Sequence, residues 1–178
     1  MKLIILDRDG VINHESDEYI KSKEEWRPIA GSLEAIARLY HSGYRIIVVS
    51  NQSGLARGKY TIEDLNAIHD KMHHLLAGYG GVIEAIFFCP HGPDDHCECR
   101  KPKPGLYLEV AQRLRIKLHK VYAVGDKVSD IQAAMAAGAK PVLVRTGYGQ
   151  SAADGDAVSD GVPVFDDLAD FVDWLLQR

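Results

Sequence analysis

The chain has 178 residues, of which 46% are hydrophobic and 26% charged, and its formal net charge is −4. This length and composition are typical of one soluble domain, which we expect to span residues 1–178. The negative charge gives no basic surface for nucleic acid, and the N-terminal apolar run is too short for a membrane span or a secretory signal. We therefore expect a cytoplasmic monomer with neither nucleic-acid nor membrane partners.

Short apolar segments alternate with helical patterns along the chain, which predicts a parallel sheet with helices on both faces. The predicted strands are 2–6, 45–49, 83–88, 120–124 and 141–144. The predicted helices are 32–41, 61–77, 104–115, 130–137 and 167–176, with Ser32, Thr61 and Ser129 as three of the caps. We expect a three-layer Rossmann-like α/β fold without a cap domain, because the long loops 13–31 and 89–103 are too short for one.

Polar side chains follow three of the predicted strands directly. The first strand ends in Asp7 and Asp9, two carboxylates that are costly to place there without a cation or a reacting group. The second strand ends in Ser50, and the fourth leads into Asp126 and Asp130. Because the carboxyl ends of parallel strands meet at one edge of the sheet, these groups should converge. Such a set favours phosphoryl transfer, in which positioning and charge neutralisation do most of the work.

The residue types suggest separate tasks in that reaction. Asp7 and Asp126 could hold Mg²⁺, a hard cation that prefers oxygen ligands. The metal and a lysine of the segment 100–104 would offset the repulsion between a phosphate and an attacking carboxylate. Ser50 and the amides after it could bind the non-bridging oxygens. A carboxylate nucleophile would form an aspartyl-phosphate, and Asp9 could protonate the leaving oxygen and then activate water.

Each of these features also has a structural interpretation, as surface acids, a turn, a helix start or a basic loop. Four such accidents in this order along the chain are improbable. A non-catalytic phosphoacceptor switch, like a receiver domain, uses similar groups. Its acceptor aspartate, however, lies in the middle of the chain, after an acid pair at the start. An acid/base beside the nucleophile favours turnover over storage of the phosphoryl group.

All three cysteines of the chain lie close together, as Cys89-x-His91 and, five residues later, Cys97-x-Cys99. This set is a poor disulfide framework but suits tetrahedral zinc. Four protein ligands leave no open position, so we expect a structural Zn²⁺ that orders the loop leading into segment 100–104. The alternatives are three unliganded cysteines, or a zinc-loop interaction module that would leave the other motifs unexplained.

The ordered motifs resemble the haloacid dehalogenase superfamily over residues 3 to about 146. The family pattern is D-x-D, then Ser or Thr after the second strand, then Lys, then an acidic G-D-x-x-x-D motif. The resemblance implies that Asp7 is the nucleophile and Asp9 the general acid/base. It also implies that Ser50 and Lys101 bind the phosphoryl group, and Lys101 fits the Arg-Lys-Pro pattern better than Lys103 does.

The same resemblance implies a catalytic Mg²⁺. Its ligands would be Asp7, Asp126 and the backbone carbonyl of Asp9, with the carbonyl of Lys127 near the metal. The cysteine–histidine loop and the following C-R-K-P-x-P-G narrow the resemblance to the branch of heptose bisphosphate and histidinol phosphate phosphatases, which has no cap domain. The implied substrate is a small phosphorylated sugar, dephosphorylated at C7 of D-glycero-D-manno-heptose 1,7-bisphosphate; histidinol phosphate is the alternative.

Without a cap, substrate choice must depend on the loops. Arg100 could bind a second phosphate through its fork of donors. Further candidates for substrate contact lie in the first long loop and after the second strand: Glu15, Glu18, Tyr19, Asn51, Gln52, Ser53 and Arg57. Each of these could equally be a surface residue. The histidines outside the cysteine loop, His69 among them, are expected to face solvent.

Overall fold

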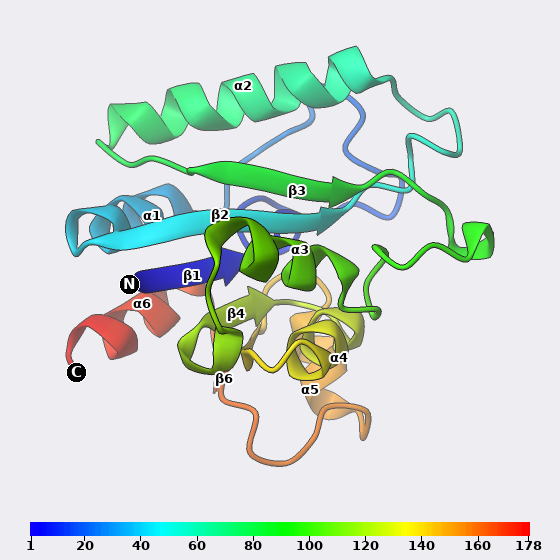
Figure 1. Cartoon of the computed structure of the whole chain (residues 1–178). Helices are drawn as coiled ribbons and strands as arrows, with labels where there is room; N and C mark the ends of the chain where they lie inside the picture. The colour runs from blue at the N-terminus through cyan, green and yellow to red at the C-terminus, as the bar shows by residue number, and fades with distance from the viewer.

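The computed structural model describes residues 1–178, and its six strands form one parallel sheet in the order β3-β2-β1-β4-β5-β6 (Figure 1). The strands are β1 (Lys2–Leu6), β2 (Tyr44–Asn51), β3 (Ala85–Cys89), β4 (Tyr122–Gly125), β5 (Lys140–Val144) and β6 (Val164–Phe165). The helices are α1 (Ser32–His41), α2 (Ile62–Gly78), α3 (Gly105–Leu114), α4 (Val128–Ala136), α5 (Gly149–Asp154) and α6 (Leu168–Leu176). Two short 3₁₀ turns cover Pro93–Asp95 and Leu118–Lys120. This architecture confirms the predicted three-layer α/β fold.

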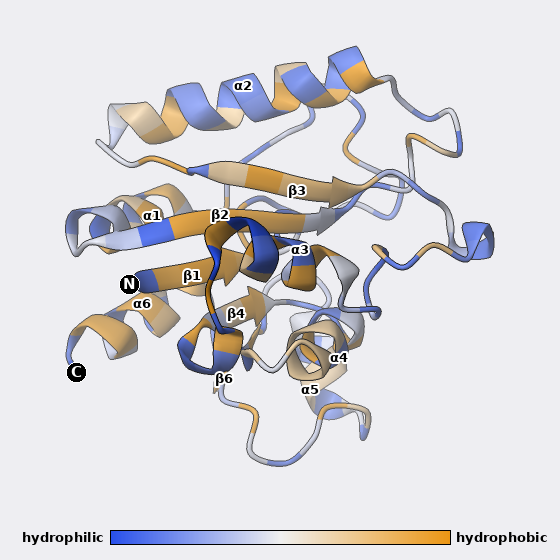
Figure 2. Ribbon diagram, in the orientation of Figure 1, coloured by the Kyte–Doolittle hydropathy of each residue, from blue (hydrophilic) through white to orange (hydrophobic).

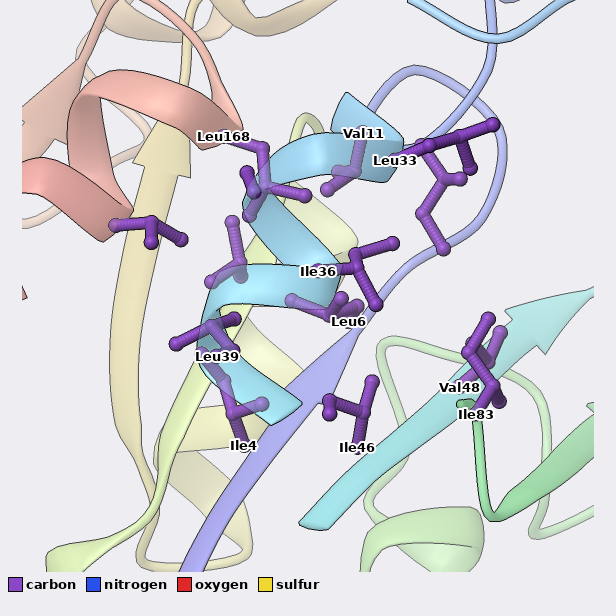
Figure 3. Close-up of a cluster of buried hydrophobic side chains, with 14 of the residues drawn as sticks. Ile4, Leu6, Val11, Leu33, Ile36, Leu39, Ile46, Val48, Ile83 and Leu168 are labelled. Atoms are coloured by element: carbon purple, nitrogen blue, oxygen red, sulfur yellow. The ribbon is translucent and has the colours of Figure 1, made fainter. Parts of the chain in front are cut away.

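The central strands are apolar on both faces because helices cover both (Figure 2). Ile4 and Leu6 of β1 belong to a cluster of 23 buried residues with α1, α2 and α6, whereas Leu3 and Ile5 belong to one of 14 with α3 and α4. Figure 3 shows side chains of α1 pointing at those of β1 in the larger cluster. Each such buried side chain contributes about 1.5–3 kcal/mol, so the larger cluster carries most of the apolar stabilisation.

Two helices of the larger cluster, α1 and α2, have a cap residue that the sequence predicted, and the structure differs from the prediction at α1. Gly31, with φ of 82°, precedes α1, and Ser32 is its first residue rather than its cap. The Ser32 hydroxyl instead donates to the Ile12 carbonyl at 2.6 Å, which ties the first long loop to the helix. The Thr61 cap of α2 is confirmed, since its hydroxyl accepts from the backbone N–H of Asp64 at 3.2 Å.

The strand register brings the carboxyl ends of β1, β2 and β4 to one level. Leu6 is paired with Val48 on one side and Val124 on the other, so the residues that follow emerge together. The loops 13–31 and 89–103 extend beyond this edge (Figure 1). No helix combines the length and apolar character that crossing a membrane requires.

Candidate active site

A buried ammonium group lies at the centre of this edge. Lys101 is 3% exposed, and its Nζ lies 3.0 Å from Asp7 Oδ1 and 2.7 Å from Asp130 Oδ1. It also donates to the Val49 carbonyl at 3.0 Å. Burial alone would lower the pKa of Lys101, but the charges of Asp130 and Asp7 raise it well above its usual value. The lysine is therefore a permanent positive charge in contact with the first carboxylate of the D-x-D motif.

The backbone of Lys101 is fixed by the end of β2. Asn51 Oδ1 accepts from the Lys101 N–H at 3.0 Å, and Asn51 Nδ2 donates to the Lys101 carbonyl at 3.1 Å. Lys103, the other lysine of this segment, instead pairs at the surface with Glu98 at 2.7 Å. The structure therefore brings Lys101, and not Lys103, to Asp7.

Asp126 follows β4 and is fully buried, yet only one of its oxygens is satisfied. Oδ2 accepts from the Tyr148 N–H at 2.9 Å, whereas Oδ1 has no hydrogen-bond partner. Gly10 and Gly147 have φ of 86° and 59° and approach the carboxylate so closely that a Cβ would lie 2.0 and 2.1 Å from Oδ2. Only glycine fits both the backbone conformation and the contact. An orphaned buried oxygen of this kind indicates a missing polar or cationic partner.

Asp130 is used differently from Asp126, and the start of α4 explains how. The predicted cap Ser129 is wrong, because α4 begins at Val128 and no serine oxygen accepts from its first turn. Asp130 Oδ2 accepts from the backbone N–H groups of Asp126 and Lys127 at 3.1 and 3.0 Å. This carboxylate is therefore occupied in holding the turn after β4 and in pairing with the buried lysine.

The three acids Asp7, Asp126 and Asp130 offer oxygens that all lie within 4.8 Å of one another. Burial, together with the neighbouring carboxylates, raises the pKa of Asp7 to about 7 and that of Asp126 to about 9. Since Asp130 is already occupied, Asp7 and Asp126 supply the free oxygens. A hard divalent cation fits this donor set, because it relieves the repulsion and satisfies the orphaned oxygen.

The Asp9 carboxylate accepts hydrogen bonds from three side chains. It accepts from Arg8 Nε at 3.0 Å, from Asn13 Nδ2 at 2.9 Å and from Gln52 Nε2 at 3.0 Å. Burial would raise the pKa of Asp9, but the charge of Arg8 and these hydrogen bonds lower it below its usual value. The carboxylate is therefore ionised in the free site.

Sequence reasoning missed Arg8 and misplaced His69. Arg8 is fully buried, and its Nη1 lies 3.0 Å from Nε2 of His69, which is 8% exposed rather than solvent-facing. Burial and the adjacent Arg8 charge lower the pKa of His69 to about 3, so the imidazole is neutral. The signal was the apolar stripe of α2: His69 is four residues after Leu65 and three before Met72, both buried.

Ser50, at the end of β2, is buried beside this network. Its Oγ accepts from Gln52 Nε2 at 2.8 Å, and Gln52 Oε1 accepts from the hydroxyl of Tyr60 at 2.5 Å. Because Tyr60 fixes the orientation of the amide, Gln52 donates to Ser50, and the serine hydroxyl itself donates only across a long contact to the Asn51 carbonyl at 3.5 Å. The Gln52 amide therefore links Ser50 to Asp9, whose Oδ2 it also reaches at 3.0 Å, and a phosphoryl-binding role for Ser50 stays a prediction.

A cavity of about 460 Å³ opens over these groups. Of the predicted substrate residues, those lining it are Glu15, Tyr19, Asn51, Gln52, Ser53, Arg100 and Lys101. Glu18 lines a neighbouring cavity on the outer side of the first long loop, and Arg57 is exposed away from both. A smaller cavity of about 30 Å³ shares walls with the main one and reaches Asp7. The carboxylate is thus accessible from the cavity.

Further wall residues were not expected from the sequence. Lys127 points its ammonium at Glu15, with Nζ to Oε2 at 2.6 Å, and lies over the ring of Tyr148. The Tyr148 hydroxyl donates to Asp17 of the first long loop. These contacts join the loop after β1 to the turns after β4 and β5. They form a polar rim on the cavity.

The four expected zinc ligands come together at the end of β3. Cys89 Sγ lies 3.1 Å from Cys99 Sγ and 3.6 Å from Cys97 Sγ, and His91 Nδ1 lies 3.3 Å from Cys99 Sγ. Zn–S bonds of about 2.3 Å place tetrahedral thiolates roughly 3.8 Å apart, so a small relaxation would accommodate the ion. The Cys₃His set is complete and closed, as a structural site requires.

Known proteins similar to this chain match it over its whole length. A relative from Bordetella bronchiseptica is 53% identical over 178 residues, covering 100% of this chain and 99% of the relative. One from Pseudomonas aeruginosa is 48% identical over 175 residues, covering 98% of each. Both are named D-glycero-beta-D-manno-heptose-1,7-bisphosphate 7-phosphatase.

Solved structures of proteins with the same type of name are also similar to this chain. The D,D-heptose 1,7-bisphosphate phosphatase of B. bronchiseptica, complexed with magnesium and phosphate, matches with a TM-score of 0.97 and 54% identity over 99% of each chain. The D,D-heptose 1,7-bisphosphate phosphatase of Burkholderia thailandensis matches with a TM-score of 0.79 and 41% identity over 100% of each chain. A family model described as "HAD-hyrolase-like" matches residues 98–171. With the D-x-D carboxylates, the buried lysine and the acidic turn at one sheet edge, this chain belongs to the haloacid dehalogenase-like hydrolases.

Proposed function

We propose that this protein is a Mg²⁺-dependent phosphatase that removes the C7 phosphate of D-glycero-β-D-manno-heptose 1,7-bisphosphate through an aspartyl-phosphate. The observation that carries the proposal is the contact between Lys101 and Asp7, at 3.0 Å, beside an open polar cavity. The relatives that bear this name share about half of their residues with this chain, over its full length. Their names specify the β-anomer, and we propose the same anomer here.

In the first step an oxygen of Asp7 attacks phosphorus, and the bond from phosphorus to the C7 oxygen breaks. Lys101 offsets the charge that the phosphate dianion brings to the nucleophile, and the Ser50 hydroxyl donates to a non-bridging oxygen. The incoming phosphate dianion favours the protonated form of Asp9. An ionised Asp9 would place a second negative charge beside the dianion in a desolvated cavity. Asp9 gives that proton to the leaving oxygen, so the product departs as an alcohol.

In the second step a water molecule attacks the phosphorus of the aspartyl-phosphate. Asp9 takes the proton of this water, and the bond between phosphorus and Asp7 breaks to release inorganic phosphate. The donors around Asp9 favour its ionised form, which is the form that a base needs. The same side chain therefore acts as acid and then as base.

Asp7 and Asp126 would hold the Mg²⁺, with the carbonyl of Asp9 as a further ligand. When bound, the ion supplies positive charge against the phosphoryl oxygens. The free Oδ1 of Asp126 is the support in this chain for that assignment. The Lys127 carbonyl accepts from the N–H groups of Asp130 and Ile131 at the start of α4, and its role near the metal stays a prediction.

The cavity walls suit a small phosphorylated sugar. Arg100 and Lys127 give cationic groups for the phosphate that does not react, and Glu15 and Tyr19 give polar groups for hydroxyls. A volume of about 460 Å³ lies in the range of small-molecule sites. Cytoplasmic location and a monomeric state stay predictions.

We expect the protein with Mg²⁺ to release phosphate from the β-anomer of the heptose 1,7-bisphosphate. Its kcat/KM should exceed that for the α-anomer, fructose 1,6-bisphosphate or histidinol phosphate by about tenfold or more, or roughly 1.4 kcal/mol of transition-state binding. Asp7→Asn should lower turnover by roughly 10³-fold or more, because it removes the nucleophile. Steady-state phosphate release measures both effects.

Asp156→Asn, at an exposed acid in the loop after α5, is the matched control and should keep wild-type turnover. A preference for histidinol phosphate would replace the substrate assignment. Full activity of Asp7→Asn would contradict the mechanism.

Mg²⁺ should stabilise the wild-type protein and leave Asp126→Asn almost unaffected. At a metal concentration 100 times the dissociation constant, binding to the native state adds about 2.7 kcal/mol to the free energy of unfolding. Asp126→Asn removes a ligand and one of three crowded acids, so without metal this variant should be at least as stable as wild type. Thermal unfolding with and without Mg²⁺ makes the comparison, and an equal rise of Tm in both proteins would count against Asp126 as a ligand.

The purified protein should carry about one zinc ion per chain, bound by the Cys₃His set. Cys97→Ser should lose zinc and lower Tm, because ligand binding energy stabilises the loop before Lys101. His96→Asn, at the exposed histidine next to Cys97, is the control and should keep the zinc content and the Tm of the wild-type protein. Elemental analysis and thermal unfolding decide the matter, and a zinc-free wild-type protein would refute the prediction.

A further inference from the structure

Arg8 is absent from the walls of the cavity, yet it holds the side chain that the proposed mechanism uses for proton transfer. We propose that Arg8 and His69 are positioning residues that hold the Asp9 carboxylate in the orientation from which it protonates the sugar leaving group. The proposal rests on the proposed function. It assigns a task to a buried pair whose side chains line neither of the two cavities at the site.

The contact between Arg8 and Asp9 fixes the plane of the carboxylate. Arg8 Nε and Nη2 donate to Asp9 Oδ1 at 3.0 and 2.8 Å, and Nη2 also reaches Oδ2 at 3.1 Å. Asn13 Nδ2 also donates to Oδ1, at 2.9 Å, and Gln52 Nε2 donates to Oδ2 at 3.0 Å. A planar fork against a planar carboxylate restricts both its rotation and its displacement, which a single point charge would not do.

His69 holds the far end of the guanidinium. A guanidinium only donates hydrogen bonds, so at 3.0 Å from Arg8 Nη1 the Nε2 atom of His69 must be the acceptor. The imidazole is therefore neutral, with its proton on Nδ1. His69 is fixed in turn by α2 and by its tilted contact with the Phe88 ring, at 6.4 Å between centroids. The position of Asp9 is thus set by α2 and β3, two elements outside the D-x-D loop.

The charges allow no alternative pairing. Arg8 is fully buried, and Asp9 is the only carboxylate that it contacts. Its remaining side-chain partners, His69 and Gln52, are neutral acceptors that satisfy N–H groups without competing for the charge. Because a buried cation without its anion is strongly unfavourable, the guanidinium keeps Asp9 beside it. An apolar residue at position 8 would fill the space without that penalty, which favours a functional reason for the arginine.

Substrates with different leaving groups distinguish a role in positioning Asp9 from a general role in stabilising the fold. A sugar alkoxide leaves poorly and needs a proton, whereas 4-nitrophenolate leaves well without one. A misplaced Asp9 should therefore slow the cleavage of alkyl phosphates much more than that of 4-nitrophenyl phosphate. The comparison belongs in kcat/KM, which includes the steps up to departure of the leaving group and excludes the later attack of water.

The experiment measures kcat/KM for the heptose bisphosphate and for 4-nitrophenyl phosphate in the Mg²⁺-loaded protein and its variants. His69→Leu should lower the first value by about tenfold or more, within the range of general acid effects, and the second by less than about twofold. His69→Gln should restore part of the loss, because its amide oxygen accepts from Arg8. Arg8→Lys keeps the charge without the fork and should show the same selectivity. His74→Leu, at an exposed position of α2, is the control and should change neither value.

Equal losses on both substrates in His69→Leu and Arg8→Lys would overturn the proposal, as would unchanged values in both. The two variants act on different side chains, so either one that folds, by circular dichroism, decides the matter. A wild-type protein with no activity on any alkyl phosphate would instead overturn the proposed function and this inference with it.

Discussion

The buried ammonium of Lys101 is the constraint on which the site depends. Its Nζ joins Asp7 after β1, the Val49 carbonyl of β2 and Asp130 of α4, at 2.7 to 3.0 Å. A desolvated charge of this kind is tolerated only when its partners are fixed around it. Asn51 fixes the backbone of the lysine, and the cysteine–histidine loop delivers it to the sheet edge. The position of Lys101 Nζ therefore depends on the strand register, on the start of α4 and on the conformation of the cysteine–histidine loop.

One lysine does not balance the acids that it gathers. Asp130 is taken up by the lysine and by two backbone N–H groups, and Asp126 keeps an unpaired oxygen in a fully buried position. Such an arrangement costs stability in the free chain, as functional sites commonly do. Gly10 and Gly147 maintain it, since any side chain there would collide with the Asp126 carboxylate. The site is thus built to be completed by a cation and a phosphoryl group.

The parts of the site that follow from strand order could be predicted from the sequence. Parallel strands place their ends at one edge, so Asp7, Ser50 and Asp126 had to converge once the strands were recognised. The cysteine–histidine loop was equally readable, because ligand spacing is a local property. The choice between Lys101 and Lys103 depends on the clamp that Asn51 makes on the Lys101 backbone, which the sequence did not reveal.

Features that depend on packing between distant elements could not be predicted. The Arg8–His69 contact joins residues 61 positions apart, and no local pattern reveals it. Tyr148 reaches the cavity from the stretch between the last predicted strand and the last predicted helix, where the sequence indicated neither the short helix α5 nor the two-residue strand β6. The two serine caps failed because Ser32 found a tertiary partner and Asp130 took the place of Ser129. In each case a tertiary interaction overrode a reasonable local preference.

The proposed mechanism requires the carboxylate of Asp7 to accept the phosphoryl group. Rapid acid quenching during turnover, followed by peptide mass spectrometry, tests it most directly, since acyl phosphates survive brief acid treatment. We expect a phosphorylated peptide whose modified residue is Asp7, present in wild type and absent from Asp7→Asn. Phosphorylation at another residue, or turnover by Asp7→Asn without any phosphorylated peptide, would contradict it.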